Sequence, residues 1–375
     1  MTILHLERKF TSLTETFIIN QINSVLLFSH AVFTIKELKN LPNEAKVFSP
    51  KNSLNTKYLS RSKTLFFKKI FDEVQPGLIH GHFLTDSRFF HPLTKQIKSI
   101  PKICSCYGYD VSRFPKKFGF LSSLYLKTIF TDYDIFLAMS LDMKKDLIKI
   151  GCPENKIIIH YHGIDTSMFK VERTYLPKDV LNLLTIGSLV EKKGHLTVLK
   201  ALNELKNKEN FVKFKYVIVG NGKLKARLKG YVEDHNLENE VFFIDAIKHG
   251  PEFSMQLQDA DVFIHPSVIT RNGDKEGIPG TIVEAMASGL PVVSTFHAGI
   301  PEIIESEFNG LLINEHDHLS LANHIKSLHT SHTLRETLGT NAKNTALNKL
   351  DIKIRNKHLQ TIYAAALNKK KNEIR

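Results

Sequence analysis

The chain has 375 residues, 42% hydrophobic and 24% charged, a composition that excludes a fibrous or disordered protein and predicts about two globular domains. Its net charge of +13 is uneven, with a surplus of 10 positive charges in residues 1–180 and of 3 in residues 181–375. A basic first half indicates an anionic neighbour, either nucleic acid or a phospholipid surface.

The cysteines and the apolar segments of the chain indicate in which cellular compartment we expect the protein. Cys104, Cys106 and Cys152 are too few for a disulfide framework, and the Cys-x-Cys pair lacks a second pair for a metal. Charges interrupt residues 1–10, so we do not expect a signal peptide there. No stretch approaches the roughly 18 apolar residues of a membrane span. We therefore expect a cytoplasmic protein, soluble or peripheral to a membrane.

Short apolar runs alternate with helical patterns along the chain, which is typical of a parallel sheet covered on both faces. In chain order the predicted strands are Thr2–Leu6, Leu78–His80, Lys102–Ser105, Ile135–Ala138, Ile157–Tyr161, Leu181–Ile186, Lys215–Val219, Val241–Ile244, Val262–His265 and Pro291–Ser294. We predict two doubly wound α/β domains, residues 1–175 and 176–350. Residues 351–375 form a terminal helix that packs back toward the first domain.

Two Asp-x-Asp triplets, residues 132–134 and 259–261, stand in similar decapeptides before a predicted strand. Such carboxylate pairs can bind Mg²⁺ or Mn²⁺ at a diphosphate. Both triplets, however, lie at the amino end of a strand, whereas parallel sheets bind ligands at the carboxyl ends. We therefore interpret both triplets as structural.

Residues 276–289, Glu-Gly-Ile-Pro-Gly-Thr-Ile-Val-Glu-Ala-Met-Ala-Ser-Gly, predict a glycine-lined turn and then a helix over 281–288. The unpaired N–H groups and partial positive charge of a helix start suit a diphosphate. The residues expected to line this site are Gly277, Ile278, Pro279, Gly280 and Thr281.

Glu284 lies one turn inside that helix, where its carboxylate could accept hydrogen bonds from two ribose hydroxyls. Glu276 lies on the preceding loop, nearer a transferred sugar. The alternative is a solvated Glu276 and a Glu284 that only stabilises the helix start. Residues 187–194 favour the first interpretation, because this turn after a strand places Lys193 at the same sheet edge. Gly220 and Gly222 permit another close backbone approach nearby.

These motifs resemble a known family. Gly-x-Leu-x-x-x-Lys-Gly at 187–194, Val-Gly-x-Gly at 219–222 and Glu-Gly-x-Pro…Glu-Ala-Met-Ala-x-Gly-x-Pro-Val-Val at 276–293 resemble the retaining GT-B glycosyltransferases of family 4. The first half adds motifs at 14–20, 80–82, 107–112 and 163–165. They resemble the branch that contains the colanic-acid and amylovoran galactosyltransferases of exopolysaccharide assembly.

The resemblance implies two Rossmann-like domains that face each other across a cleft, with the donor held by the second domain and the acceptor by the first. It implies that Glu284 binds ribose, that Lys193 binds diphosphate and that Glu276 contacts the donor sugar. Catalytic residues are then Glu276 and Tyr107. Other donor contacts are Gly187, Ser188 and Gly222, and the acceptor contacts are His82, Asp110 and Glu15.

The implied reaction moves a hexose, with UDP-galactose as the expected donor, to a lipid-linked oligosaccharide of exopolysaccharide, capsule or O-antigen. It retains the anomeric configuration by front-face substitution, with the leaving diphosphate as base. No metal and no cofactor are expected.

Two positions depart from the family pattern. Many relatives have Arg where Ser188 stands, so Lys193 acts alone, or Lys192 or the helix start compensates. Many have His where Tyr107 stands. Tyrosine can hydrogen-bond there but cannot carry a proton near neutral pH.

Residues 113–130 mix cations with phenylalanines, so they form either a contact with anionic membrane or an ordinary packed helix. A nucleic-acid-binding protein would need stacking platforms or a groove-entering motif, and neither is found. A sugar-nucleotide epimerase of the same architecture and a non-catalytic donor-binding subunit remain as alternatives.

Overall fold

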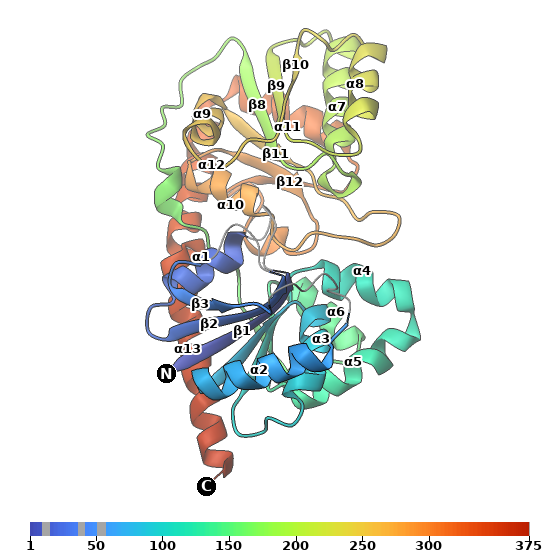
Figure 1. Ribbon diagram of the computed structural model, residues 1–375. Helices are drawn as coiled ribbons and strands as arrows, with labels where there is room; N and C mark the ends of the chain where they lie inside the picture. Colours follow the sequence, from blue (N-terminus) through green and yellow to red (C-terminus); the bar gives the residue numbers. More distant parts are fainter. Residues whose placement is uncertain (10–15, 37–41, 51–57, 375) are drawn as a thin grey trace. The chain divides into compact units, whose positions relative to one another are not determined.

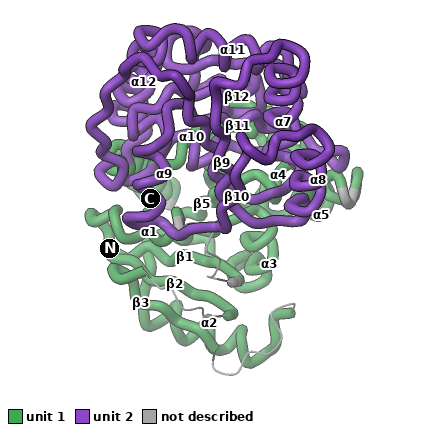
Figure 2. Tube along the Cα trace, turned by 90° about the horizontal axis from the view of Figure 1, so that it is seen from above, with its two compact units in different colours: residues 1–163, 352–375 green, residues 164–351 purple. Residues whose placement is uncertain are grey.

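The computed structural model describes residues 1–9, 16–36, 42–50 and 58–374. They form two compact units, unit 1 with residues 1–163 and 352–375, and unit 2 with residues 164–351 (Figure 2). Each unit is a parallel β-sheet flanked by helices, which confirms the predicted α/β architecture of two Rossmann-like domains.

In the described part of unit 1, seven parallel strands lie in the order β3-β2-β1-β4-β5-β6-β7. The strands are β1 Thr2–Lys9, β2 Ser29–Lys36, β3 Ala45–Phe48, β4 Leu78–His82, β5 Lys102–Ser105, β6 Ile135–Ala138 and β7 Ile157–Ile159. The helices are α1 Thr16–Ser24, α2 Arg61–Val74, α3 Leu84–Thr94, α4 Tyr109–Phe118, α5 Phe120–Asp132, α6 Leu141–Lys149 and α13 Ile352–Ile374 (Figure 1). Strand order reverses between β1 and β4, so the switch point of the sheet lies there.

Alternating side chains of β1 supply both faces of this sheet. Ile3 packs with Leu359 and Tyr363 of α13, the red helix of Figure 1. Leu4 and Leu6 point the other way, into a cluster that contains side chains of α2 and α3. The terminal helix therefore covers one face of the first sheet, and the amphipathic spacing of its apolar residues explains why.

Unit 2 holds a parallel sheet with six described strands in the order β10-β9-β8-β11-β12-β13. The strands are β8 Leu181–Ile186, β9 Phe214–Val219, β10 Val241–Ile244, β11 Val262–His265, β12 Val292–Thr295 and β13 Leu311–Ile313. The helices are α7 His195–Asn203, α8 Lys225–Asp234, α9 Pro251–Asp259, α10 Gly280–Ala287, α11 His318–Thr330 and α12 His332–Thr345. Here strand order reverses between β8 and β11.

The first unit ends before the predicted boundary at 175/176, which falls inside unit 2. Arg173 donates to the backbone oxygens of Leu257 at 2.6 Å and Ala260 at 2.5 Å. Tyr175 donates to that of Gly289 at 2.6 Å. Hydrogen bonds of this kind fasten residues 173–175 to the second sheet and its helices, although the segment reads as a polar linker.

The Asp-x-Asp triplets serve strand pairing, as expected from their place at the amino ends of strands. Asp134 accepts from the backbone N–H of Lys102 at 2.8 Å, and Asp261 accepts in the same way from Asn182 at 2.9 Å. Each aspartate also donates its own N–H back to the partner's carbonyl oxygen. The two units therefore repeat one local device.

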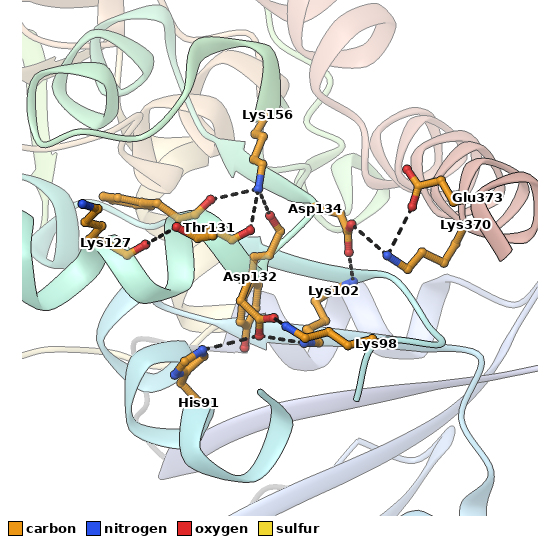
Figure 3. Close-up of polar contacts among 12 residues, drawn as sticks. His91, Lys98, Lys102, Lys127, Thr131, Asp132, Asp134, Lys156, Lys370 and Glu373 are labelled. Carbon is orange, nitrogen blue, oxygen red and sulfur yellow. Dashed lines mark hydrogen bonds and ion pairs between the residues drawn. The ribbon is translucent and has the colours of Figure 1, made fainter. Parts of the chain in front are cut away.

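Lysines occupy the remaining oxygens of the first triplet (Figure 3). Asp132 pairs with the buried Lys102 at 2.7 Å and also with Lys98. Asp134 lies 3.6 Å from Lys370 of α13. The ion pairs of these carboxylates are those expected of a structural triplet.

Cys104, Cys106 and Cys152 are free thiols buried in unit 1. Within the described ranges no helix combines the length and the apolar character needed to cross a membrane.

Candidate functional site

The loop after β8 lies at the switch point of unit 2. It turns through the short 3₁₀ segment Glu191–Lys193 and ends at Gly194, whose φ is +68°. A Cβ at Gly194 would lie 1.8 Å from the carbonyl oxygen of Pro266, so only glycine fits there. This close approach brings Lys193 to the end of β11, where its Nζ lies 3.4 Å from Nε2 of His265.

Glu276 receives the charge of this loop. Its Oε1 lies 3.1 Å from Nζ of Lys193 and 3.6 Å from Nζ of Lys192. Burial works to raise the pKa of Glu276, but the two lysine charges together hold the pKa below its usual value. The group is therefore an anion near neutral pH. Lys192 supplies a second cation close to the one expected at Lys193.

A histidine fixes the loop that carries Glu276. The backbone N–H of Glu276 donates to Nε2 of His297 at 3.1 Å, and Nδ1 of His297 donates to Glu315 at 2.7 Å. Glu315 also accepts from the backbone N–H of Ile269 at 2.8 Å. The chain of bonds holds three loops of unit 2 together around the carboxylate.

Helix α10 begins at Gly280, one residue from the predicted start, after the loop of Gly277, Ile278 and Pro279. Glu284 is buried in its second turn, and its Oε1 accepts from Nε2 of His249 at 3.0 Å. This hydrogen bond raises the pKa of His249.

Several buried polar atoms near this helix lack a partner among the described residues. They are Oε2 of Glu284, Oγ1 of Thr281 and Nδ1 of His265. His265 is neutral, because burial and the nearby charge of Lys193 lower its pKa far below the usual value. Its Nε2 faces the ammonium and accepts, so the unpaired Nδ1 carries the proton. A buried polar group without a partner is costly, and a ligand can satisfy it.

The other predicted donor contacts lie around the same loop. Ser188 is exposed, and its backbone oxygen accepts from His195 at 3.1 Å. Burial lowers the pKa of His195 to about 4, although this hydrogen bond works to raise it. A Cβ at Gly222 would lie 2.4 Å from the backbone oxygen of Leu189, so this glycine allows two loops to touch. Gly187 has room for a Cβ, 3.6 Å from the His265 ring.

The predicted acceptor side lies in unit 1, at the carboxyl ends of β4 and β5. Tyr107 is half-buried there, and burial raises the pKa of its hydroxyl well above the usual value. Asp110 is fully buried and accepts from the backbone N–H groups of Leu84, Tyr107 and Gly108 at 2.7–3.1 Å. Its oxygens are thus used to hold the loop. Glu15 lies outside the described residues.

His82 is fully buried, and both of its ring nitrogens are occupied by groups of the protein. Nδ1 bonds the hydroxyl of Tyr107 at 2.7 Å, and Nε2 bonds Nδ1 of His5 at 2.9 Å. No nitrogen of His82 remains for a direct acceptor contact. A ligand can therefore meet His82 only through Tyr107.

Three histidines, His5, His80 and His82, bring ring nitrogens within 4.8 Å of one another. His5 lies on a different strand from the other two, so the motif at 80–82 does not point to it. His80 bonds the hydroxyls of Tyr363 at 2.5 Å and Ser105 at 2.8 Å. A cation here would have to displace hydrogen bonds of all three side chains.

Four residues of the unit 2 site escaped sequence reasoning: Lys192 as a partner of Glu276, His249, His265 and His297. Only the end of a predicted strand pointed to His265, and no motif marked His249 or His297.

Two family models match most of the chain. Residues 28–168 match the family model described as Glycosyltransferase Family 4, and residues 169–345 match the model described as Glycosyl transferases group 1. The putative colanic acid biosynthesis glycosyltransferase WcaL of Escherichia coli K12 is 39% identical over 194 residues, which cover 52% of this chain and 47% of that protein. The amylovoran biosynthesis glycosyltransferase AmsK of Erwinia amylovora is 38% identical over 194 residues, which again cover 52% of this chain and 47% of that protein. The chain spans about half the length of these curated relatives.

Solved structures share the fold. HepE of Anabaena in complex with UDP superposes with a TM-score of 0.77 over 97% of this chain and 99% of that one, at 18% identity. Sucrose-phosphate synthase of Thermosynechococcus elongatus superposes with a TM-score of 0.78 over 97% of this chain and 98% of that one, also at 18% identity.

Proposed function

The chain belongs to the GT-B glycosyltransferases, and from this membership we propose that it transfers a hexose from a nucleotide-diphosphate sugar to a lipid-linked glycan in exopolysaccharide biosynthesis. The observation that carries the proposal is the set of unpaired buried atoms on α10 and at the end of β11: Oε2 of Glu284, Oγ1 of Thr281 and Nδ1 of His265. The ring of His265 brings its Nε2 within 3.4 Å of Nζ of Lys193, and Lys193 and Lys192 both lie near the carboxylate of Glu276. A ligand with hydroxyls and a diphosphate would satisfy both the polar atoms and the charges.

Each part of the donor has a partner in this proposal. Glu284 accepts from ribose hydroxyls through its free oxygen. Lys193, Lys192 and the start of α10 neutralise the diphosphate, so a second lysine compensates for the serine at position 188. The diphosphate takes over the lysines that now hold Glu276, which frees that carboxylate to accept from a hydroxyl of the sugar.

In the proposed reaction the bond between the anomeric carbon and the phosphate oxygen breaks as the acceptor oxygen bonds the same face of that carbon. The acceptor proton passes to the leaving diphosphate. The lysines stabilise the negative charge that develops on the leaving group, and this stabilisation is the main contribution of the protein. Because the lysines supply the charge, we propose that the reaction needs no divalent metal.

The choice of donor follows names of related proteins. WcaL and AmsK are named for colanic acid and amylovoran biosynthesis, and HepE has been solved with UDP and with UDP-glucose. A further structural relative is a lipopolysaccharide galactosyltransferase. We accordingly propose UDP-galactose as the donor.

A thermal-shift panel of UDP, GDP, ADP and their sugars in EDTA tests this proposal. A ligand at 100 times its dissociation constant stabilises the folded state by about 2.7 kcal/mol. We expect UDP and UDP-galactose to stabilise the wild-type protein. Glu284→Ala should weaken UDP binding by about 10-fold to 100-fold, since it removes hydrogen bonds to a charged group. Glu238→Ala, at an exposed carboxylate of the same unit, is the matched control. The absence of a shift with every nucleotide would refute the proposal, and a shift seen only with a divalent cation would refute metal independence.

We propose further that the chain works at the inner face of the cytoplasmic membrane. Helix α5 buries Leu126, Ile129 and Phe130 in the core but exposes Leu121 and Leu124. Each lysine near an anionic lipid surface contributes about 1 kcal/mol to the free energy of membrane binding. Co-sedimentation should occur with phosphatidylcholine vesicles that contain phosphatidylglycerol and be lost without it. Equal sedimentation with both would refute an electrostatic contact.

A further inference from the structure

Buried histidines of three neighbouring strands form a continuous chain of hydrogen bonds in unit 1. His30 lies on β2, His5 on β1 and His82 at the end of β4, and β1 pairs with both neighbours. Nε2 of His30 lies 2.7 Å from the carbonyl oxygen of Val25, and its Nδ1 lies 2.9 Å from Nε2 of His5. Nδ1 of His5 lies 2.9 Å from Nε2 of His82, whose Nδ1 reaches the hydroxyl of Tyr107 at 2.7 Å.

The first bond determines the direction of all the others. A carbonyl oxygen only accepts, so His30 must donate from Nε2. Burial lowers the pKa of His30, and it lowers the pKa of His5 and His82 still further, so all three rings are neutral. A neutral ring with its proton on Nε2 has a bare Nδ1 that must accept. His30 therefore accepts from His5, and His5 in turn accepts from His82.

The same logic reaches Tyr107, the half-buried end of the chain of hydrogen bonds. With its proton on Nε2, His82 has a bare Nδ1, so the Tyr107 hydroxyl must donate to it. The single proton of that hydroxyl is therefore used in the hydrogen bond to His82. Its oxygen then offers only lone pairs to a ligand.

We infer that His82, His5 and His30 are positioning residues that make Tyr107 an obligate hydrogen-bond acceptor for a sugar hydroxyl. The inference rests on the proposed function for the identity of the ligand, but its direct test does not. A phenol that was free to rotate would donate or accept equally well. Fixed in this way, Tyr107 selects a hydroxyl over an ether or ester oxygen at the same place, because neither of those has a proton to give.

The ring nitrogens report their own protonation, so nuclear magnetic resonance of the full chain labelled with ¹⁵N-histidine tests the inference directly. We expect each of the three rings to show a protonated Nε2 and a bare Nδ1, unchanged between pH 6 and 8. A proton on Nδ1 of any of them, or a charged ring, would overturn the inference. So would a shift of the His5 and His82 signals on addition of Zn²⁺ alone, because it would reveal a cation site in place of the chain.

Two variants at the far end of the chain test how it acts. His30→Leu removes the acceptor for His5, so we expect His5 and His82 to lose their single tautomer. His30→Gln keeps an acceptor and a donor and should restore it. His160→Leu removes another buried histidine of unit 1 that lies outside the chain, and it should leave the three tautomers unchanged. Wild-type tautomers in His30→Leu would overturn the directing role.

Activity with UDP-galactose gives the second readout. Tyr107→Phe removes one hydrogen bond and should lower kcat/KM about 5-fold to 10-fold. His30→Leu should lower it in the same direction and His30→Gln should recover it. If Tyr107→Phe binds UDP-galactose more weakly but UDP as tightly as the wild-type protein does, the Tyr107 hydroxyl contacts the donor sugar. If only kcat falls, the Tyr107 hydroxyl contacts the acceptor.

An unchanged kcat/KM and unchanged binding of UDP-galactose in Tyr107→Phe would overturn the ligand contact. If the wild-type protein shows the expected tautomers but turns over no nucleotide sugar, the proposed function is refuted and the inference about the histidines is not.

Discussion

Two lysines hold the carboxylate of Glu276, and this arrangement sets its expected contribution to turnover. Glu276→Gln keeps the shape of the side chain but removes the negative charge that the proposed reaction places beside the donor sugar. We expect kcat to fall about 100-fold, as is typical when a group that acts in the transition state is lost, with a smaller change in KM. Steady-state kinetics with the donor identified by the thermal-shift panel would measure this. A wild-type kcat would remove Glu276 from the reaction.

His249 is expected to make stability depend on pH. Its hydrogen bond to Glu284 raises its pKa in the folded state. The resulting stabilisation is fully present below the unfolded pKa of about 6.5 and disappears as pH rises through the raised folded value. His249→Leu should therefore lower the Tm more at pH 6 than at pH 8.5. An equal loss at both values would show that the pair carries no charge.

At the level of single residues, motifs predicted the core of the candidate donor site but only part of its surroundings. Glu276, Glu284 and Lys193 stand at recognisable spacings next to glycines, so the sequence alone placed them at one sheet edge. His249 and His297 come from loops without a motif, and only tertiary packing brings them to the carboxylates. His5 and His30 belong to strands whose neighbours in the sheet are distant in sequence, which explains why their chain of bonds was not predicted.

The turn at Gly194 illustrates a constraint on a whole element. Gly194→Ala would force a Cβ into the backbone of Pro266 at a positive φ, and it should destabilise unit 2 by about 2 kcal/mol or more. Gly230→Ala lies in α8 with open space around it and should stabilise by about 0.5–1 kcal/mol. Urea unfolding of the two variants compares them directly. A neutral Gly194→Ala would show that the loop after β8 can rearrange.

Strand prediction succeeded where apolar runs were continuous and bounded by turn residues. Leu181–Ile186 and Val262–His265 were predicted with the observed ends. Ser29–Lys36, Ala45–Phe48 and Leu311–Ile313 were not predicted. The first of these is almost wholly buried although it carries a histidine and a threonine, so its polar residues concealed a central strand. The other two are edge strands of only four and three residues, which are too short to establish a periodicity in the sequence.

Across the whole molecule, buried neutral histidines predict sensitivity to mild acid. Burial lowers the pKa of eleven described histidines; these are His5, His30, His80, His82, His91, His160, His162, His195, His265, His324 and His358. Below about pH 6.5 the unfolded chain binds protons that the folded chain does not, so the free energy of unfolding falls as pH falls. Each fully titrating group removes about 1.4 kcal/mol per pH unit.

We therefore expect the Tm to fall steeply below pH 6.5 and the protein to unfold well above pH 4. Thermal unfolding from pH 8 to pH 5 measures the slope. His160→Gln takes away one of the titrating groups and should make the slope shallower. A flat Tm over this range would contradict the neutral state of these rings.

The return of α13 to the first sheet has a consequence for biogenesis. Ile3, Leu78, Ile103 and Leu137 form an apolar sheet face that is covered by side chains of residues 359–367. Residues 359–367 leave the ribosome only after all of unit 2 has been synthesised. The apolar face of the first sheet therefore stays exposed while unit 2 folds. We expect residues 1–163 expressed alone to aggregate, and residues 352–375 supplied in trans to rescue them. The domain begun first is thus the last to be finished.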